Sequence, residues 1–432
     1  IINIMPRRFL DIRPTNLPPS GVVSYKSGYP IITFDIAEQD AFLMGNSVRV
    51  CGELQILKDG NAVPTAGDTL AMDSRLGIFS IVDTITLSST KTKQTIESIR
   101  NYNRFMATYL PMTASNQDLI GHIGEVALTL PSDDAQRVSV VNSTQDNEND
   151  FCVYFPTGLL QNGRPIPLSG DTIGGITMEI QLAPDSAVLF DTAGTSTASG
   201  YSDAEYRLKN LKLVCEIEDM DESNKSLAKA NGFEYSSISS YFSTINSTNA
   251  ILNYSLGMSR VRSVFVNFIK SSYLNNLDQN SMQTIIPIKS GGDIGEISQI
   301  TFTKGGVRFP ADMVNDTNFK LDNKVAPLDP QNLRSFINSV QPYSQNNRLQ
   351  ISPVNTNRRW TGNDNNVLQG GLVFGCGVAY DNLGSDGADF SKENFGLQID
   401  LGLTDDSPNS VFVFVHAKNT LLFSGAGIQV VS

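Results

Sequence analysis

The sequence predicts an all-β protein made of two tandem antiparallel β-sandwiches, with short helices at their flank and between them. About eight short segments in each half alternate apolar and polar residues with a period of two, which is typical of half-buried strands. The 34 Gly and 19 Pro residues, together with many Asn, Ser and Thr, suit a chain with frequent turns. The order of the segments in the first half also recurs in the second half.

Length and composition limit the classes of protein that the chain can be. Its 432 residues are enough for two domains of roughly 200 residues each. A hydrophobic content of 40% with 18% charged residues indicates a globular protein. The net charge of −12 argues against a surface that binds phosphate backbones, so we expect no direct nucleic-acid binding. No apolar run approaches the ~20 residues of a membrane-spanning helix.

Prolines and polar stretches predict the domain boundaries. Residues 1–28 contain Pro6, Pro14, Pro18 and Pro19 and are predicted to form an irregular N-terminal arm, with its arginines in solvent. The first domain covers residues 29–219, a linker helix covers 220–232, and the second domain covers 233–432. A polar insertion spans about residues 310–370 of the second domain.

The linker helix has clear start and stop signals. Asp219 or Asp221 can accept a hydrogen bond from the first helical turn, and Asn231-Gly232 favours a C-terminal stop.

In the first half, alternation predicts strands at 32–36, 48–54, 81–88, 151–155, 176–182 and 208–217. Between them Ile96, Ile99, Asn103 and Met106 recur every three or four residues. This spacing predicts an amphipathic helix of about three turns on the side of the sheets. Residues 111–150 are predicted to form a polar loop, whose acidic end at 146–150 lacks the spacing of a calcium loop.

In the second half, strands are predicted at 251–256, 261–268, 297–303, 371–378, 397–403, 411–415, 420–423 and 428–431. Three of the patterns echo the first half. F-C-V-Y-F (151–155) corresponds to G-C-G-V-A-Y (375–380), I-T-M-E-I-Q-L (176–182) to G-L-Q-I-D-L-G-L (396–403), and F-S-I-V-D-T-I-T-L-S-S (79–89) to I-G-E-I-S-Q-I-T-F-T-K (294–304). This order predicts a duplicated domain whose sheets are each buried on one face.

The four cysteines, Cys51, Cys152, Cys215 and Cys376, lie far apart within apolar stretches. We expect four reduced, buried thiols and folding in a reducing compartment; the alternatives are a disulfide pair or a metal cluster.

Residues that could perform chemistry are few. His122 and His416 are the only histidines, and no nucleophile motif accompanies either. No phosphate-binding glycine motif precedes a helix. We therefore predict no catalytic, cofactor-binding or metal-binding residues, and no enzyme.

Two other functions remain open. Trp360 lies beside Arg358 and Arg359 and either anchors a loop or forms a ligand patch, as in a two-domain attachment or carbohydrate-binding protein. A glycoside hydrolase would need two carboxylates across a groove. The pairs Asp133-Asp134 and Asp405-Asp406 lie in turn-like contexts, where acidic pairs are common, so neither pair is indicated as the catalytic one.

Several segments, in order, resemble one family. They are Y-P-I-I-T-F-D-I (29–36), N-S-V-R-V-C-G-E-L (46–54), F-S-I-V-D-T-I-T-L-S-S with T-I-E-S-I-R-N-Y-N-R (95–104), I-P-L-S-G with G-G-I-T-M-E-I-Q-L-A (174–183), L-K-N-L-K-L-V-C-E-I-E-D-M-D-E (208–222), G-V-R-F-P and F-G-L-Q-I-D-L-G-L. The chain resembles the double jelly-roll major capsid proteins of tailless icosahedral DNA viruses, and within them those of polinton-like viruses and virophages. The resemblance spans most of residues 29–431, with no counterpart for the insertion at 310–370.

The resemblance implies two tandem eight-stranded antiparallel jelly-roll barrels. It also implies a homotrimer with a pseudo-hexagonal outline, in contact with neighbouring capsomers in a virion shell, folded and assembled in host cytoplasm or nucleus. The N-terminal arm would face minor capsid or penton proteins, or an internal membrane where one is present.

Overall fold

A computed structural model describes most of the chain. The described residues are 7–60, 62–64, 68–73, 76–113, 127–128, 148–191, 193–282, 297–309, 338–340, 375–380, 387–401, 409–424 and 427–432. The predicted insertion at 310–370 therefore lies outside them, apart from residues 338–340, as does most of the predicted loop at 111–150.

The first barrel consists of two antiparallel sheets. In one sheet the strands β1 (Arg7–Ile12), β12 (Glu205–Asp219), β4 (Arg49–Leu57) and β8 (Glu148–Val153) lie side by side in that order. The other sheet has the order β2 (Ile31–Ile36), β10 (Ile176–Leu182), β6 (Val82–Ser89) and β7 (Thr95–Ile99). The short strands β3 (Ala41–Leu43) and β9 (Ile166–Pro167) extend the first sheet beyond β12, and β5 (Leu70–Met72) and β11 (Leu189–Asp191) form a separate two-stranded sheet. The other short elements of this barrel are α5 (Asp185–Val188) and the 3-10 turns η1 (Gly45–Ser47) and η2 (Gly77–Ile81).

The second barrel repeats this arrangement strand for strand. One sheet has the order β13 (Phe233–Thr244), β20 (Ser410–Ser424), β15 (Val261–Ile269) and β18 (Gly375–Ala379). The other has the order β14 (Asn249–Tyr254), β19 (Phe395–Leu401), β16 (Ile297–Lys304) and β17 (Val307–Arg308). The 3-10 turn η3 (Ser271–Tyr273) and the C-terminal strand β21 (Gly427–Val431) lie outside the eight.

The equal strand order confirms the predicted pattern of duplication. In both barrels the first, eighth, third and sixth of the eight strands form one sheet, and the second, seventh, fourth and fifth form the other, which is the order of a jelly roll. Each pair of echoing sequences occupies equivalent places: β8 and β18, β10 and β19, and β6 and β16. The all-β prediction is confirmed for the described residues.

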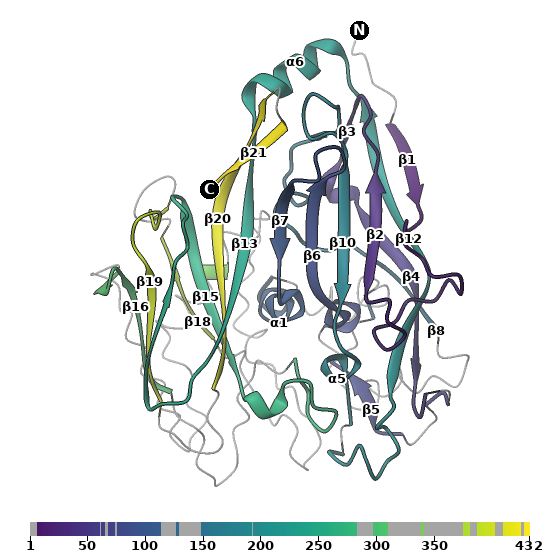
Figure 1. Cartoon of the computed structure of the whole chain (residues 1–432), viewed down its shortest axis with the longest axis vertical. Coiled ribbons are helices and arrows are strands. Elements are labelled where there is room, and N and C mark those ends of the chain that lie inside the picture. The colour runs from purple at the N-terminus through teal and green to yellow at the C-terminus, as the bar shows by residue number, and fades with distance from the viewer. Residues whose placement is uncertain are drawn as a thin grey trace.

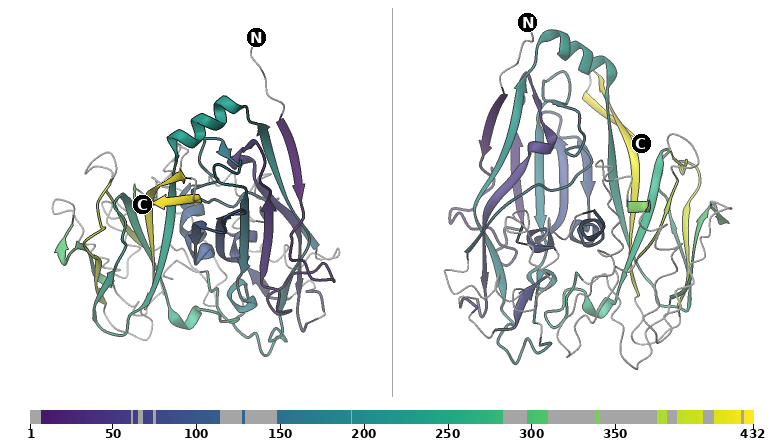
Figure 2. Two further views of the ribbon diagram at one scale, coloured as in Figure 1. Left: turned by 45° about the horizontal axis from the view of Figure 1, so that its top comes forward. Right: turned by 180° about the vertical axis from the view of Figure 1, so that it is seen from behind.

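The barrels stand side by side with their strands roughly parallel to the long axis (Figure 1). Helix α6 (Glu222–Asn231) crosses from one barrel to the other at the end where β1 begins, and the view from behind shows the same bridge (Figure 2). The Asp221 carboxylate accepts a hydrogen bond from the Asn224 N–H at 2.7 Å, and Gly232 ends the helix at φ 64°. The predicted cap and stop residues are therefore confirmed.

Two predictions of local structure are wrong. Residues 7–12, predicted to be irregular, form β1 and pair with Leu213–Glu218 along one edge of β12. The prolines that suggested an arm all lie outside this strand. The predicted helix around Ile96 is instead β7, and helix α1 (Tyr102–Thr113) starts after it.

A third prediction, that each sheet is buried on one face, is wrong for the sheet that contains β20. Residues 410–417 of β20 are all buried. Val411, Val413 and Val415 belong to the core of the second barrel, whereas Phe412 and Phe414 belong to the core of the first. This sheet therefore lies between two hydrophobic cores, and its residues need not alternate in polarity.

Candidate functional site

Buried charged and polar side chains of the described chain gather where the two barrels meet. Helix α1 lies at the centre of this contact. The Phe105 ring stacks on Tyr109, with centroids 5.1 Å apart, and contacts Phe265 and Phe414 of the second barrel at 6.2 and 6.0 Å. Nδ2 of Asn267 in β15 donates to the Arg104 carbonyl at 3.2 Å and to the Thr108 hydroxyl at 2.7 Å. The helix thus bonds to both barrels.

Arg104 is a buried cation at this contact. Its guanidinium donates to Ser281 Oγ at 3.1 Å and lies 5.5 Å from the centroid of the Phe412 ring. Burial lowers the pKa of Arg104 to about 10, so the side chain keeps its charge at neutral pH. The guanidinium is therefore held by two neutral acceptors, Ser281 Oγ and Met282 Sδ, and by the face of the Phe412 ring. Asp83 and Asp73 favour its charge.

Strands β7 and β13 form a polar seam beside α1. The Tyr235 hydroxyl donates to the Ile96 carbonyl at 2.7 Å, and the Ser240 hydroxyl donates to the Arg100 carbonyl at 2.6 Å. Between these two bonds lies Glu97, which is 4% exposed. Its carboxylate accepts the N–H groups of Gly158 and Leu159, both at 3.0 Å.

Gly158 brings the backbone of the first barrel against that of the second. A Cβ at this position would lie 1.3 Å from the Ser236 carbonyl oxygen in β13. Only a glycine permits so close an approach of two backbones. The residue therefore sets the distance between the barrels at the seam.

A segment of the second barrel also closes over the first barrel at the far end of the contact. The Asp191 N–H donates to the Leu277 carbonyl at 2.6 Å, and the Ser196 N–H donates to the Asp278 carboxylate at 2.7 Å. Asn280 Nδ2 donates to the Asp73 carboxylate at 2.9 Å. Together with α1 and the seam, these bonds hold the barrels at several separate points.

Most of the residues considered for chemistry lie outside the part of the chain that the structure describes. His122, Trp360, Asp133-Asp134 and Asp405-Asp406 all lie outside the described residues. His416 is fully buried in β20, and burial lowers its pKa to about 3, which leaves the imidazole neutral. Among the described residues no group of three His, Cys, Asp or Glu side chains could hold a metal ion.

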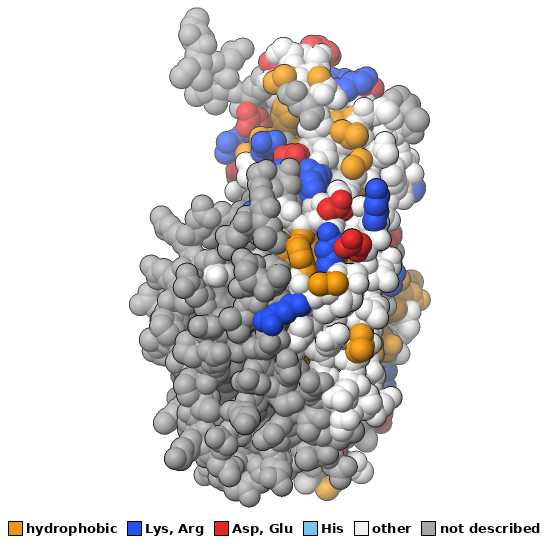
Figure 3. Space-filling view, turned by 90° about the vertical axis from the view of Figure 1, so that its left-hand side faces the viewer, with side chains coloured by type: hydrophobic (Ala, Val, Ile, Leu, Met, Phe, Trp, Pro, Cys, Tyr) orange, Lys and Arg blue, Asp and Glu red, His pale blue; other side chains and the backbone are white. Residues whose placement is uncertain are grey.

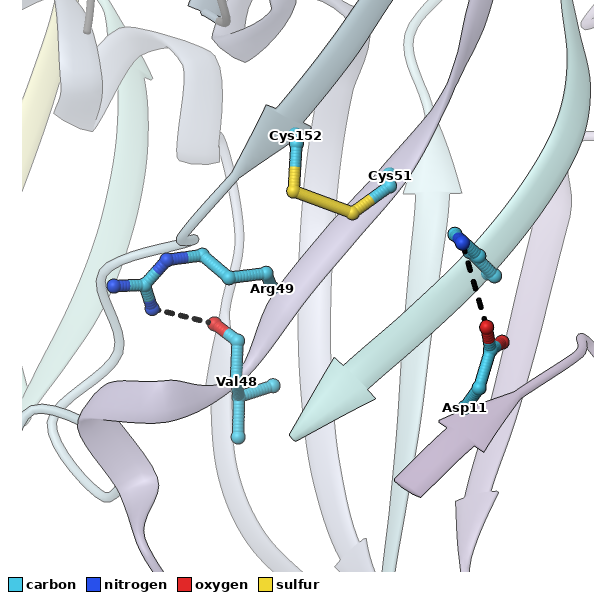
Figure 4. Close-up of a disulfide and its surroundings, with 6 residues drawn as sticks. Asp11, Val48, Arg49, Cys51 and Cys152 are labelled. Atoms are coloured by element: carbon cyan, nitrogen blue, oxygen red, sulfur yellow. Dashed lines mark hydrogen bonds and ion pairs between the residues drawn. A yellow bond between two sulfur atoms is a disulfide. The ribbon is translucent and has the colours of Figure 1, made fainter. Parts of the chain in front are cut away.

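The cysteines differ from the prediction in one pair. Cys51 in β4 lies directly opposite Cys152 in β8, and a disulfide joins them across the two strands (Figure 4). The prediction of four reduced thiols is therefore wrong for this pair, because strand pairing brings together residues 101 positions apart. Cys215 and Cys376 are free and buried, as predicted, and burial raises the pKa of Cys215 to about 12.

An open groove of 620 Å³ runs beside the disulfide on the outer face of the same sheet. Its walls carry charges of both signs, including Asp11, Arg13 and Lys212, and Lys212 Nζ lies 3.3 Å from an Asp11 carboxylate oxygen. Within this groove the Lys212–Asp11 pair is one in which opposite charges face each other.

Sequence reasoning missed the residues that matter most at the contact. Glu97 lies within the segment that was predicted to be a helix and was not singled out, and Gly158 carried no signal of its own. The one available hint for Glu97 was a carboxylate between the two apolar residues Ile96 and Ile99.

Comparison by sequence finds no relatives: no protein-family model matches the chain, and no curated protein matches it.

Comparison of structures finds similarity over the whole chain. The VP54 protein of PBCV-1, fitted into a reconstruction of the virophage Sputnik, matches with a TM-score of 0.57 and 12% identity, over 99% of this chain and 97% of that one. The Faustovirus major capsid protein matches with a TM-score of 0.54 and 10% identity, over 97% and 91%. A structure of the Sputnik virophage matches with a TM-score of 0.52 and 13% identity, over 100% and 89%. Together with the strand order of both barrels, these matches show that the chain has the double jelly-roll fold.

Proposed function

We propose that the chain is a major capsid protein, the structural subunit of an icosahedral virion shell. The observation that carries this proposal is the likeness of the entire chain, both barrels included, to major capsid proteins, with 97% and 91% of two such chains covered. The described contact between the barrels fits a structural role, because α1, the seam and the bonds to segment 271–282 hold the two barrels as one unit.

We further propose that three copies form one capsomer. Three chains of two similar barrels place six barrels in a ring of pseudo-hexagonal outline, and such rings tile a surface with one gene product. On the face that Figure 3 shows, the described acidic and basic side chains are interspersed and hydrophobic side chains stand mostly apart. Among exposed apolar residues, Phe9, Ile251 and Val307 are 74%, 66% and 70% exposed and lie on different strands, so they would serve contacts on several sides.

The end of the molecule that carries α6 and the start of β1 is the proposed inner end of the capsomer (Figure 1). There it would meet minor capsid or penton proteins, or a membrane where the virion has one. Within the described residues, no helix is both long and apolar enough to cross a membrane.

Light scattering coupled to size-exclusion chromatography tests the trimer. We expect a mass near three times 47.0 kDa, held over a range of micromolar concentrations. Negative-stain images of that peak should show six-lobed particles. Circular dichroism and a cooperative thermal transition serve as the control that the chain is folded. A folded species of single-chain mass at every concentration would contradict the proposal.

A further inference from the structure

We propose that Glu97 is a proton-operated latch between the two barrels, which holds them more tightly when its carboxyl is neutral and less tightly when it is charged. The proposal concerns the coupling of the barrels within one chain, so it goes beyond the proposed function and does not depend on it.

Glu97 lies in β7, at the seam where the first barrel meets the second. One carboxylate oxygen accepts the Gly158 N–H and the other accepts the Leu159 N–H, both at 3.0 Å. Both donors belong to the first barrel, and their surroundings contact the second barrel. Gly158 packs directly against the Ser236 carbonyl of β13, and the carbonyl of the adjacent Ile96 accepts a hydrogen bond from the Tyr235 hydroxyl of β13 at 2.7 Å. A change of charge on Glu97 therefore changes the strength of the contacts that hold the two barrels together at the seam.

Among the residues that the structure describes, Glu97 has no cationic partner. From α1, the end of β8 and β13 it is faced by Tyr102, Tyr154 and Tyr235, which are neutral near pH 7. Burial raises the pKa of Glu97 to about 7, although its backbone N–H donors favour the charged form. Desolvation thus outweighs hydrogen bonding here, and the carboxyl changes charge close to neutral pH.

The charged groups around this cluster have other partners or do not titrate in the same range. Arg49 lies over the Tyr154 ring at 5.1 Å from its centroid. Glu234 on β13 pairs with Lys418 at 3.2 Å and Arg260 at 3.4 Å. His416, opposite Ile238 on β20, is buried, and burial lowers its pKa to about 3.

The sign of the effect follows from linkage. The pKa of the carboxyl is 4.5 in its ordinary state and about 7 in the folded chain. The folded seam therefore binds a proton more tightly than the opened seam does. The stabilisation is fully present below pH 4.5 and is lost as the pH rises through 7. The latch is closed in mild acid and weakened above neutrality.

Hydrogen exchange of the full chain, followed by mass spectrometry between pH 5.5 and 8.5, tests the latch. After correction for the chemical exchange rate, peptides that cover 156–160 and 236–240 should lose protection by at least about tenfold from the lowest to the highest pH. Glu97→Gln should abolish most of this change. The matched control is Glu179→Gln, which alters an exposed carboxylate on β10. This variant should keep the pH-dependent loss of protection in the seam.

The wild-type chain alone provides a second test should Glu97→Gln fail to fold. The peptide that covers β10, residues 176–182, does not bond to Glu97 and serves as the internal reference. Protection in the seam that falls with pH while β10 stays constant supports the latch. Seam protection that is independent of pH, or that changes in parallel with β10, overturns it, as does a Glu97→Gln chain that keeps the full pH response.

Discussion

Substitution of Gly158 by alanine is the sharpest test of how the barrels are held together. The added Cβ would lie 1.3 Å from the Ser236 carbonyl oxygen, whereas real Cβ atoms essentially never approach a heavy atom closer than 3.0 Å. The two backbones must therefore separate by roughly 1.7 Å at the seam. That movement also pulls the Gly158 N–H away from the buried Glu97 carboxylate.

We expect Gly158→Ala to lower the free energy of unfolding by about 3 kcal/mol or more. Overpacking a tight site costs about 1–3 kcal/mol, and a buried carboxylate that loses a donor adds about 1–3 kcal/mol. Urea denaturation followed by circular dichroism measures the change. The matched control is Gly163→Ala, five positions along the same connection, because a Cβ there has no heavy atom within 4 Å. Equal stability of the two variants, within about 0.5 kcal/mol, would refute the reasoning about this approach.

Three further predictions use the same unfolding and labelling methods. Phe105→Ala should cost about 3–5 kcal/mol because it empties the contact that α1 makes with both barrels, whereas Phe9→Ala, at a side chain 74% exposed, should leave stability almost unchanged. Between pH 5 and 8 the Glu97 contribution should fall by up to about 3 kcal/mol as the pH rises, since its folded pKa of about 7 exceeds 4.5, and Glu97→Gln should flatten that part of the denaturation profile. Thiol titration of the denatured chain should find two reactive thiols before reduction and four after it; four before reduction would disprove the Cys51–Cys152 disulfide.

The sequence predicts best those strands that have one face exposed to solvent. In β10 the residues Ile176, Met178, Ile180 and Leu182 are buried while Glu179 and Gln181 are exposed, so the alternation marks the strand from end to end. The linker helix was equally readable, because its cap and its stop are local signals that need no partner strand.

The errors arise where a partner strand overrides the local pattern. In β7 both Ile96 and Glu97 are buried, and the pairing with β6 shifts register between Leu87 and Ser88. This irregularity breaks the period of two, so the apolar spacing of the segment imitates a helix. Strand β1 was missed for a different reason: it is short, exposed, and defined mainly by its pairing with β12.

The contact between the barrels could not be read from the sequence at all. Gly158 and Ser236 are far apart in the chain, and nothing in the neighbourhood of either residue indicates that their backbones touch. The same holds for Cys51 and Cys152, each of which sits in an ordinary strand. These features depend on distance in space, which a single sequence does not record.

The two barrels have the same strand order but use it differently, and this asymmetry explains why they form one unit. In β12, the last of the eight strands of the first barrel, Leu211, Leu213 and Cys215 are buried while Lys212 faces solvent. In β20, the equivalent strand, Phe412 and Phe414 occupy the outer face and are buried against the first barrel. A second barrel on its own would expose this aromatic face to water, at a cost of roughly 1.5–3 kcal/mol for each large side chain. The second barrel thus carries a hydrophobic outer face that its counterpart strand in the first barrel lacks, and because the first barrel covers that face, the two barrels are stable as a pair.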